Sequence, residues 1–198
     1  MTANPLKEVK KAMRKEMGKL LAEVPQQSLE EQTKVVLQKV LSADRYKNAK
    51  RVSVFVSTVG EIQTDEVIID ALTHGKEVFI PHFIKGNDRM LMRKVPDLAA
   101  FKNLQPTLWG IRQPGPDCTW SLYEESGPLD LVLQPCVAIT EKGERLGHGK
   151  GYYDRFLTEH KTQFGKHPYK VVIAIKEQVV EKVPLSEFDV NVDLVLHP

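Results

Sequence analysis

Cysteine is scarce in this chain of 198 residues, which has only Cys118 and Cys136. Two cysteines cannot supply a disulfide framework, and these two show no spacing typical of zinc ligands. Long apolar runs are lacking as well, since none approaches the roughly 18 residues of a membrane-spanning helix. The first residues lack the apolar core of a secretory signal, and Glu8 and Glu16 are unusual in a transit peptide. We therefore expect a protein of the reducing cytoplasm that has no membrane partner.

An excess of charge of one sign is also absent. Lys and Arg number 28 and Asp and Glu number 26, which leaves a net charge of +2. This balance gives no support to nucleic-acid binding through bulk charge. The sequence shows neither a Ser-His-Asp order nor a nucleophile elbow, so it does not support covalent hydrolytic catalysis. The hydrophobic fraction of 41% predicts a folded chain, and the length suits one domain over residues 1–198.

Hydrophobic spacing predicts two helices followed by alternating strands and helices. One apolar stripe runs through residues 5–23 and another through 28–42, where Ser28 and Glu31 form a capping-box pattern. Residues 96–128 hold much of the proline and glycine and are expected to be irregular. Strands are predicted at residues 51–57, 77–81, 90–95, 129–135, 171–175 and 194–197, with helices at 64–73 and 152–160.

Alternating strands and helices predict an α/β fold with a mostly parallel sheet and right-handed crossovers. In such sheets ligands bind beyond the carboxyl ends of the strands. Residues 57–63 follow the first predicted strand, and a glycine-rich loop follows the strand at 129–135. We therefore expect both segments at the ligand-binding edge.

Residues 145–154 read Arg-Leu-Gly-His-Gly-Lys-Gly-Tyr-Tyr-Asp. Gly147, Gly149 and Gly151 stand at alternate positions, which lets backbone amides approach a ligand, and Lys150 adds positive charge. The following helix would point its positive end at the same anion. We interpret the segment as a cradle for a nucleotide phosphate, although an ordinary tight turn is about equally common for this pattern. It is not a Walker A loop, because Gly151 replaces Ser or Thr, and its glycine spacing is not the dinucleotide fingerprint.

Phosphates and flat rings could also meet residues outside this loop. Lys10 and Arg14 share a helix face and could grip phosphates, but a solvated basic face is the commoner case. Tyr152 and Tyr153 could stack on a ring or donate to a substrate, while buried tyrosines more often serve the core. Trp109 lies in the irregular stretch and could wall an aromatic pocket.

Carboxylates and one histidine allow two interpretations each. Glu61 could accept paired donors from a heterocycle, or be an ordinary loop acid. Asp154 could hold magnesium together with Asp189 or Asp193, although a helix first turn and a chain turn are the plainer roles. His148 could act as a base or as a further donor to phosphate.

Several motifs, in family order, resemble those of the 5-formyltetrahydrofolate cyclo-ligase family. The segment 145–154 strongly resembles the family signature, and the likeness covers nearly the whole chain. One departure is His148, where members often carry Arg or Tyr. The other matching segments are Lys10 with Arg14, Phe55-Val56-Ser57 with Glu61-Ile62, Trp109-x-Ile111-x-Gln113-Pro114, Ala174-x-Lys176-Glu177-Gln178, and Pro184 with Asp189 and Val192-Asp193.

The resemblance implies a three-layer α/β/α enzyme that uses ATP and magnesium to convert 5-formyltetrahydrofolate into 5,10-methenyltetrahydrofolate, ADP and phosphate. It implies catalysis by Lys150, Arg145 and Tyr152, and magnesium held by Asp154 and Asp189. The sequence does not fix the oligomeric state, and our expectation is a monomer. The implied ATP-binding residues are Lys10, Arg14, Arg145, Leu146, Gly147, His148, Gly149, Lys150, Gly151, Tyr152 and Tyr153. The implied folate-binding residues are Val56, Glu61, Trp109, His148, Gly149, Lys150, Gly151 and Tyr152.

The implied chemistry suits these residues, because phosphoryl transfer asks a protein mainly for positioning and charge neutralisation. Transfer of the γ-phosphoryl group of ATP to the formyl oxygen would make a good leaving group, and nitrogen-10 could then close the ring. Two other functions stay open: a phosphosugar isomerase that needs no ATP, and a protein that binds folate without turnover. Formation of the methenyl chromophore, dependent on ATP and magnesium, would separate the three.

Overall fold

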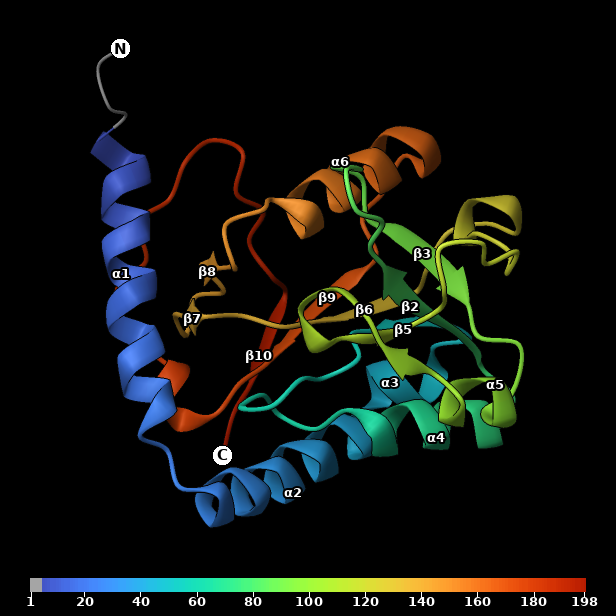
Figure 1. Ribbon diagram of the computed structural model, residues 1–198, viewed down its shortest axis with the longest axis horizontal. Coiled ribbons are helices and arrows are strands. Elements are labelled where there is room, and N and C mark those ends of the chain that lie inside the picture. The colour runs from blue at the N-terminus through green and yellow to red at the C-terminus, as the bar shows by residue number, and fades with distance from the viewer. Residues whose placement is uncertain (1–4) are drawn as a thin grey trace.

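The computed structural model describes residues 5–198. Its centre is a six-stranded sheet in the order β10-β9-β6-β1-β2-β3 (Figure 1). Neighbouring strands are parallel except β2 and β3, which are antiparallel. The predicted α/β class with a mostly parallel sheet is therefore confirmed. The strands are β1 (Arg51–Val54), β2 (Glu77–His82), β3 (Leu91–Lys94), β6 (Leu131–Gln134), β9 (Tyr169–Ile173) and β10 (Leu194–Leu196).

Helices cover both faces of the sheet and give it three layers (Figure 1). On one face lie α2 (Gln26–Ser42), α3 (Asp44–Asn48) and α4 (Asp65–Thr73), with α5 (Leu98–Lys102) beside α4. On the other face lies α6 (Tyr152–Phe164). Parallel strands need such crossovers, and the helices remove both faces of the sheet from water.

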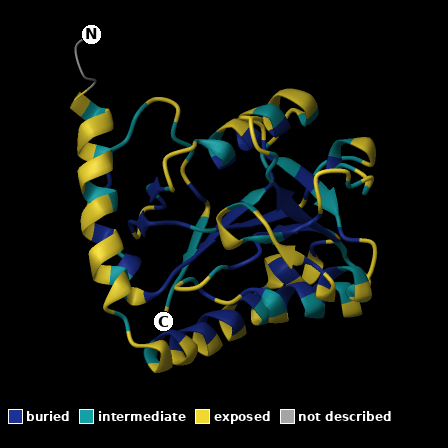
Figure 2. Ribbon diagram, in the orientation of Figure 1, coloured by how far each residue is buried: buried dark blue, intermediate teal, exposed yellow. Residues whose placement is uncertain are grey.

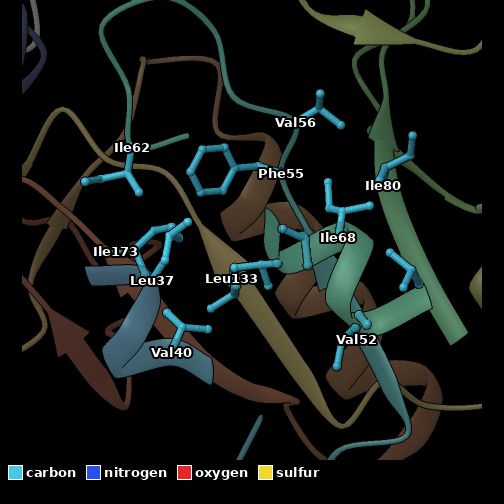
Figure 3. Packing of buried hydrophobic residues seen from close by; sticks show 14 of the residues in the cluster. Leu37, Val40, Val52, Phe55, Val56, Ile62, Ile68, Ile80, Leu133 and Ile173 are labelled. Carbon is cyan, nitrogen blue, oxygen red and sulfur yellow. The ribbon is translucent and has the colours of Figure 1, made fainter. Parts of the chain in front are cut away.

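The core follows from this layering. Buried residues concentrate in the strands, and helix residues turned to solvent are exposed (Figure 2). Along β6, Leu131 and Leu133 join the cluster under α2 and α4, whereas Val132 joins the cluster under α6. Side chains alternate between the two faces of a strand, so one apolar run supplies both layers. Leu37 and Val40 of α2 pack against the sheet in this way (Figure 3).

The first helix, α1 (Pro5–Ala22), stands beside the sheet rather than on it (Figure 1). It packs against a small hairpin formed by β7 (Ala138–Ile139) and β8 (Arg145–Leu146). Met17 is buried there among Val137, Leu146 and Val183, with Met13 beside it. The apolar stripe predicted for this helix is confirmed only in part, because Met13 and Met17 make this contact whereas Val9 and Leu20 are exposed. Among residues 5–198, no helix combines the length and apolar character that crossing a bilayer requires.

Most element boundaries differ from the sequence prediction by a few residues, and two of these differences change the interpretation of the local structure. The strand expected to reach Ser57 ends at Val54, because side-chain bonds replace the ladder: the Thr64 hydroxyl donates to the Phe55 carbonyl at 2.6 Å. The capping box expected at Ser28 is wrong. Helix α2 begins at Gln26 with Pro25 at the N-cap position, and the Ser28 hydroxyl accepts from Gln32 at 3.2 Å instead.

The sequence analysis placed the glycine-rich loop directly after the strand at 129–135. In the structure this loop does not follow β6 directly. The β7–β8 hairpin comes between them, and the loop leaves β8. Each strand of the hairpin has only two residues, too few for a periodic signal. The irregular stretch 96–128 contains α5, the short pair β4 (Gln105–Pro106) and β5 (Arg112–Gln113), and two 3-10 turns.

Candidate active site

A cavity of about 1190 Å³ opens at the carboxyl edge of the sheet. Its walls come from α1, the segment after β1, the loop 145–151, the start of α6 and the loop 186–189. A second hollow, of about 720 Å³, lies at the amino ends of the strands. There the charges already neutralise one another, as where Lys170 lies 2.8 Å from Asp193. The larger cavity is the candidate site, because ligands of α/β proteins bind at the carboxyl edge.

Each glycine of the loop lies against an arginine. A Cβ added at any of the three positions would come within 3.1 Å of a guanidinium group. Gly149 and Gly151 also have positive φ values, of 93° and 66°, which side chains disfavour. The loop is thus a bare backbone surrounded by positive charge. The pairs are Gly147 with Arg145, Gly149 with Arg14, and Gly151 with Arg155, at 2.8, 3.1 and 2.9 Å.

Lys150 projects from the exposed part of this loop and lines the cavity. Its ammonium makes no ion pair with any residue of the described range 5–198. Helix α6 begins at Tyr152 with Gly151 at its N-cap, so the positive end of the helix adjoins the loop. The arrangement is an anion cradle of the kind that the glycine pattern predicted.

Arg145 is a buried support of the loop, with only 7% of its surface exposed. Its Nη1 donates to the Pro135 carbonyl at 3.2 Å, and its Nη2 lies 3.3 Å from the Asp154 carboxylate. Its guanidinium also lies over the Tyr153 ring, 5.5 Å from the centroid. A buried charge needs such partners. Arg145 therefore fixes the first turn of α6 against the hairpin.

Helix α1 lines the cavity with four cationic residues, Lys7, Lys10, Lys11 and Arg14, and two of them make contacts with other parts of the site. Lys10 forms an ion pair with Asp189, and Arg14 Nε donates to the Gly147 carbonyl at 2.7 Å. Burial lowers the pKa of Arg14, and Asp189 raises it in part. The structure therefore places Lys10 and Arg14 in the site. The alternative, a basic helix face exposed only to solvent, does not apply to these two residues. The red segment before β10 arches between α1 and the start of α6 (Figure 1). Its Asp189 pairs with Lys10 of α1, and its Val190 N–H donates to Asp154 of α6.

Asp189 is the more heavily hydrogen-bonded of the two candidate metal ligands. Besides Lys10, it accepts from the Ser186 backbone N–H at 2.6 Å and from the Ser186 hydroxyl at 2.8 Å. Burial raises the pKa of Asp189, but these donors outweigh burial and hold it below its ordinary value. Asp154 accepts from the Val190 N–H at 3.2 Å. Asp189 therefore faces the cavity as an anion, and Asp154 lines the same cavity.

These carboxylates suit a magnesium ion that arrives with a phosphate. Magnesium keeps several waters and binds one or two carboxylates plus phosphate oxygens. Asp154 and Asp189 line the same cavity and could supply that pair. Over residues 5–198, no cluster of three or more His, Cys, Asp or Glu side chains could hold a metal by itself. The donor set fits magnesium in company with a phosphorylated ligand.

Glu61 lies across the cavity from α1. Its Oε2 accepts from the Thr58 N–H at 2.8 Å and from the Thr58 hydroxyl at 2.9 Å. Its Oε1 lies 3.7 Å from Nε2 of His148. Burial raises the pKa of Glu61, but the hydrogen bonds from His148 and Thr58 together lower it by more. The pKa of Glu61 therefore lies below its ordinary value. Thr58 saturates one oxygen of the ionised Glu61 carboxylate, so the other oxygen is left for the cavity and the glycine loop. Buried Val56 lines the same cavity.

Three aromatic rings wall another side of the cavity. Phe83 lies 5.0 Å from Tyr152 and 5.6 Å from Trp109, measured between ring centroids. Trp109 is 58% exposed and has a positive φ of 58°, unusual for a bulky side chain. Together the rings offer flat apolar surface beside the cradle.

Two buried polar groups of the cavity lack a hydrogen-bond partner within residues 5–198, namely the Tyr153 hydroxyl and Arg145 Nε. Burial raises the pKa of Tyr153 above its ordinary range, so the hydroxyl keeps its proton. Buried donors are normally satisfied, and these two atoms are enclosed by the protein rather than open to the cavity.

Some residues of the site were missed by the sequence analysis. Phe83 and Thr58 lie on ordinary loops, and Ser186 binds Asp189 from a segment without any motif. Arg155 directly follows the recognised segment, yet a helical arginine gave no signal of its own. The other predicted residues, including Leu146, line the larger cavity, except Asp193, which lines the second hollow and pairs with Lys170, so it is not a partner of Asp154 for magnesium.

Comparisons with known proteins agree on one family. The model of the 5-formyltetrahydrofolate cyclo-ligase family matches residues 6–198. A relative from Caenorhabditis elegans, named probable 5-formyltetrahydrofolate cyclo-ligase, is 49% identical over 97% of this chain and 94% of its own length. The mouse 5-formyltetrahydrofolate cyclo-ligase is 32% identical over 100% of this chain and 97% of its own length.

Solved structures give the same result. The structure of Aquifex aeolicus 5,10-methenyltetrahydrofolate synthetase superimposes with a TM-score of 0.76 at 25% identity, covering 95% of this chain and 89% of that one. A synthetase from Mycoplasma pneumoniae, at 19% identity, shares the fold with a TM-score of 0.69, covering 95% of this chain and 98% of its own. Matches to a family model, to sequences and to a structure all span almost the entire chain. This chain therefore belongs to the 5-formyltetrahydrofolate cyclo-ligase family.

Proposed function

We propose that this chain converts 5-formyltetrahydrofolate into 5,10-methenyltetrahydrofolate, using ATP and magnesium and releasing ADP and phosphate. Family membership supports the folate reaction. The observation that carries the nucleotide part is the bare glycine loop, which three arginines and Lys150 surround at the edge of the cavity. Such a loop at a helix N-terminus suits a polyphosphate.

The nucleotide would occupy the side of the cavity formed by α1 and the loop. Lys10, Arg14 and Lys150 would neutralise its phosphates, and the loop amides would bind its oxygens. Magnesium, held by Asp154 and Asp189, would neutralise the developing charge of the transferred group. Arg145 is bound to Asp154 and to the hairpin, so we assign it the positioning of the loop and of that carboxylate.

The folate would occupy the opposite side. Glu61 presents an ionised oxygen that could accept paired N–H donors from the pterin ring. Val56 gives apolar contact near it, and Tyr152 and Trp109 supply ring faces. Aromatic faces would also favour the cationic product.

The reaction needs the two ligands side by side. The formyl oxygen would take the γ-phosphoryl group of ATP, which leaves ADP. Nitrogen-10 would then attack the formyl carbon, and the carbon–oxygen bond would break as phosphate departs. Lys150 would neutralise charge during the transfer, with no covalent nucleophile on the protein.

A spectroscopic assay tests this function. The purified chain is mixed with 5-formyltetrahydrofolate, and the methenyl chromophore is followed with and without ATP and with and without magnesium. We expect the chromophore only when both are present. A phosphosugar isomerase or a folate-binding protein without turnover would give no chromophore in any mixture, and that result would refute the proposal.

Replacing Lys150 by Met tests the cradle itself. We expect turnover to fall by about 100-fold or more, because one charge near the transferred group would be lost. Lys142→Met is the matched control, since Lys142 is an exposed lysine on the turn of the β7–β8 hairpin. Near-normal turnover of Lys150→Met, with both variants folded, would contradict the role of Lys150.

Compartment and assembly stay predictions from sequence. We carry both over as proposals, a cytoplasmic compartment and a monomeric state. A relative from Arabidopsis thaliana is named mitochondrial, so members of the family differ in compartment. Analytical ultracentrifugation and cell fractionation would test the two statements separately.

A further inference from the structure

Arg155 lies beside the cradle, in the first turns of α6, and has no role in the assignments above. Its Nη2 donates to the Lys150 carbonyl at 2.8 Å and to the Asp88 carbonyl at 2.6 Å. Its guanidinium lies over the Tyr152 ring, 5.4 Å from the centroid. It is also the group that leaves no room for a side chain at Gly151. One exposed arginine thus contacts three consecutive residues at the junction between loop and helix.

The contact with the Lys150 carbonyl decides how the next peptide is oriented. A trans peptide is planar, and its C=O and N–H point in opposite directions. Since the Lys150 carbonyl is turned to Arg155, the N–H of Gly151 points away from Arg155. Lys150 and Gly151 line the cavity, whereas Arg155 is not among the described residues that do. The Gly151 amide is therefore turned to the cavity side.

Charge favours the same arrangement. A carbonyl oxygen turned to the cavity would repel a phosphate, while an amide would bind it. The guanidinium of Arg155 stabilises the carbonyl on the outer side, because hydrogen bonds to charged donors are stronger than neutral ones. The Asp88 carbonyl provides a second anchor for the same nitrogen.

We propose that Arg155 is a positioning residue of the nucleotide site, which holds the Lys150 carbonyl outward and thereby presents the Gly151 amide to a bound phosphate. The inference rests on the proposed function, because it needs a phosphate in the cradle. It adds a residue that contacts neither substrate yet sets the affinity for one of them.

Arg89 offers a matched control. It belongs to the same surface segment as Asp88 and forms an ion pair with Glu159 of α6 at 3.0 Å and another with Glu124. Its removal loosens the same segment from the same helix without touching the cradle. A purely structural role for Arg155 would therefore be reproduced by the Arg89 variant.

The experiment compares full-length wild type, Arg155→Gln, Arg155→Lys and Arg89→Gln. Calorimetry with a non-hydrolysable ATP analogue and magnesium gives Kd, and steady-state assays give KM for ATP and for 5-formyltetrahydrofolate. We expect Arg155→Gln to raise Kd and KM for the nucleotide by about tenfold, since one charged hydrogen bond is lost. KM for the folate should stay within about twofold, and Arg155→Lys should recover part of the affinity.

The outcomes are distinct. If wild type binds no nucleotide, the proposed function fails, and this inference fails with it. If wild type binds but Arg155→Gln binds within about twofold of it, only the inference is overturned. Equal losses in Arg155→Gln and Arg89→Gln also overturn it. Should Arg155→Gln not fold, Arg155→Lys decides: a loss of about threefold or more supports the inference, and unchanged affinity overturns it.

Discussion

Gly149 meets two demands that no other residue type can meet together. Its φ of 93° is disfavoured for a side chain, and an added Cβ would stand 3.1 Å from the Arg14 guanidinium. The second demand matters for function, because Arg14 belongs to α1 and reaches the loop only if the space beside Gly149 is free. A methyl group at this position would therefore act on the cradle and not only on the backbone.

We predict that Gly149→Ala weakens nucleotide binding by about tenfold, because Arg14 must withdraw from the loop. The control is Gly86→Ala, which carries the same type of strain, at a φ of 84°, with nothing within 4 Å of the new methyl group. Both variants should lose about 1 kcal/mol of unfolding free energy, from strain alone. Calorimetry and urea unfolding measure the two effects, and equal nucleotide affinity in both variants would contradict the prediction.

His160 illustrates a residue that must remain neutral. It is fully buried, its Nε2 accepts from the Leu129 N–H at 3.0 Å, and its Nδ1 lies 2.8 Å from the Lys166 carbonyl. Only the neutral ring with its proton on Nδ1 satisfies both partners. Burial lowers the pKa of His160, and the bond to Lys166 opposes this only in part.

The sign of the pH effect follows. The pKa is lower in the folded than in the unfolded state, so the unfolded chain takes up a proton first as pH falls. Stability is therefore lost below the unfolded value of about 6.5, by up to about 1.4 kcal/mol per histidine between pH 7.5 and 5.5. In urea unfolding at both pH values, we expect His160→Gln to show a smaller pH difference than wild type. An unchanged pH difference in His160→Gln would contradict the prediction.

At the scale of elements, α1 connects packing to binding. Met17, 5% exposed, fixes the helix on the β7–β8 hairpin, and the same helix carries Lys10 and Arg14 to the cavity. We predict that Met17→Ala costs about 2–3 kcal/mol of unfolding free energy and also weakens nucleotide binding. Leu37→Ala, in the core under α2, should cost a similar amount and leave the affinity unchanged. Equal affinities in the two variants would show that α1 does not position the cations.

Hydrophobic periodicity was enough to predict α1, the positions of the main strands along the chain and the mostly parallel sheet, because burial on one or two faces imposes that periodicity. It did not predict the order of the strands in the sheet. It could not predict the hairpin at Ala138 and Leu146, whose strands are too short for a period. The start of α2 was misjudged at Ser28, because the helix begins two residues earlier, directly after Pro25, whose backbone is extended.

The candidate site likewise combines features that a local sequence pattern predicts with features that it does not. The glycine loop was recognised from sequence because its chemistry is local. The contact between Lys10 and Asp189 joins residues 179 positions apart, which no local pattern can show. Phe83 reaches the cavity because of how its loop is folded, and its neighbours in sequence give no sign of that.

For the whole molecule, one domain remains a prediction, and thermal unfolding tests it. We expect a single cooperative transition, because the two core clusters share the same sheet. A magnesium–nucleotide complex at about 100 times its Kd should raise Tm by roughly 5–10 °C, whereas magnesium alone should change it little. Two separate transitions, or an equal shift with magnesium alone, would contradict these expectations.

The pairing of α1 with the segment near Asp189 has a consequence for biosynthesis. The ribosome makes Asp189 long after Lys10, because 179 positions separate the two residues, so α1 must wait for its partner. A shorter nascent chain can build most of its sheet but cannot assemble the cation pair and carboxylate of the cradle. We therefore expect nascent chains that stop before Asp189 not to capture nucleotide, so that the ligand can assist folding only once that segment has been made.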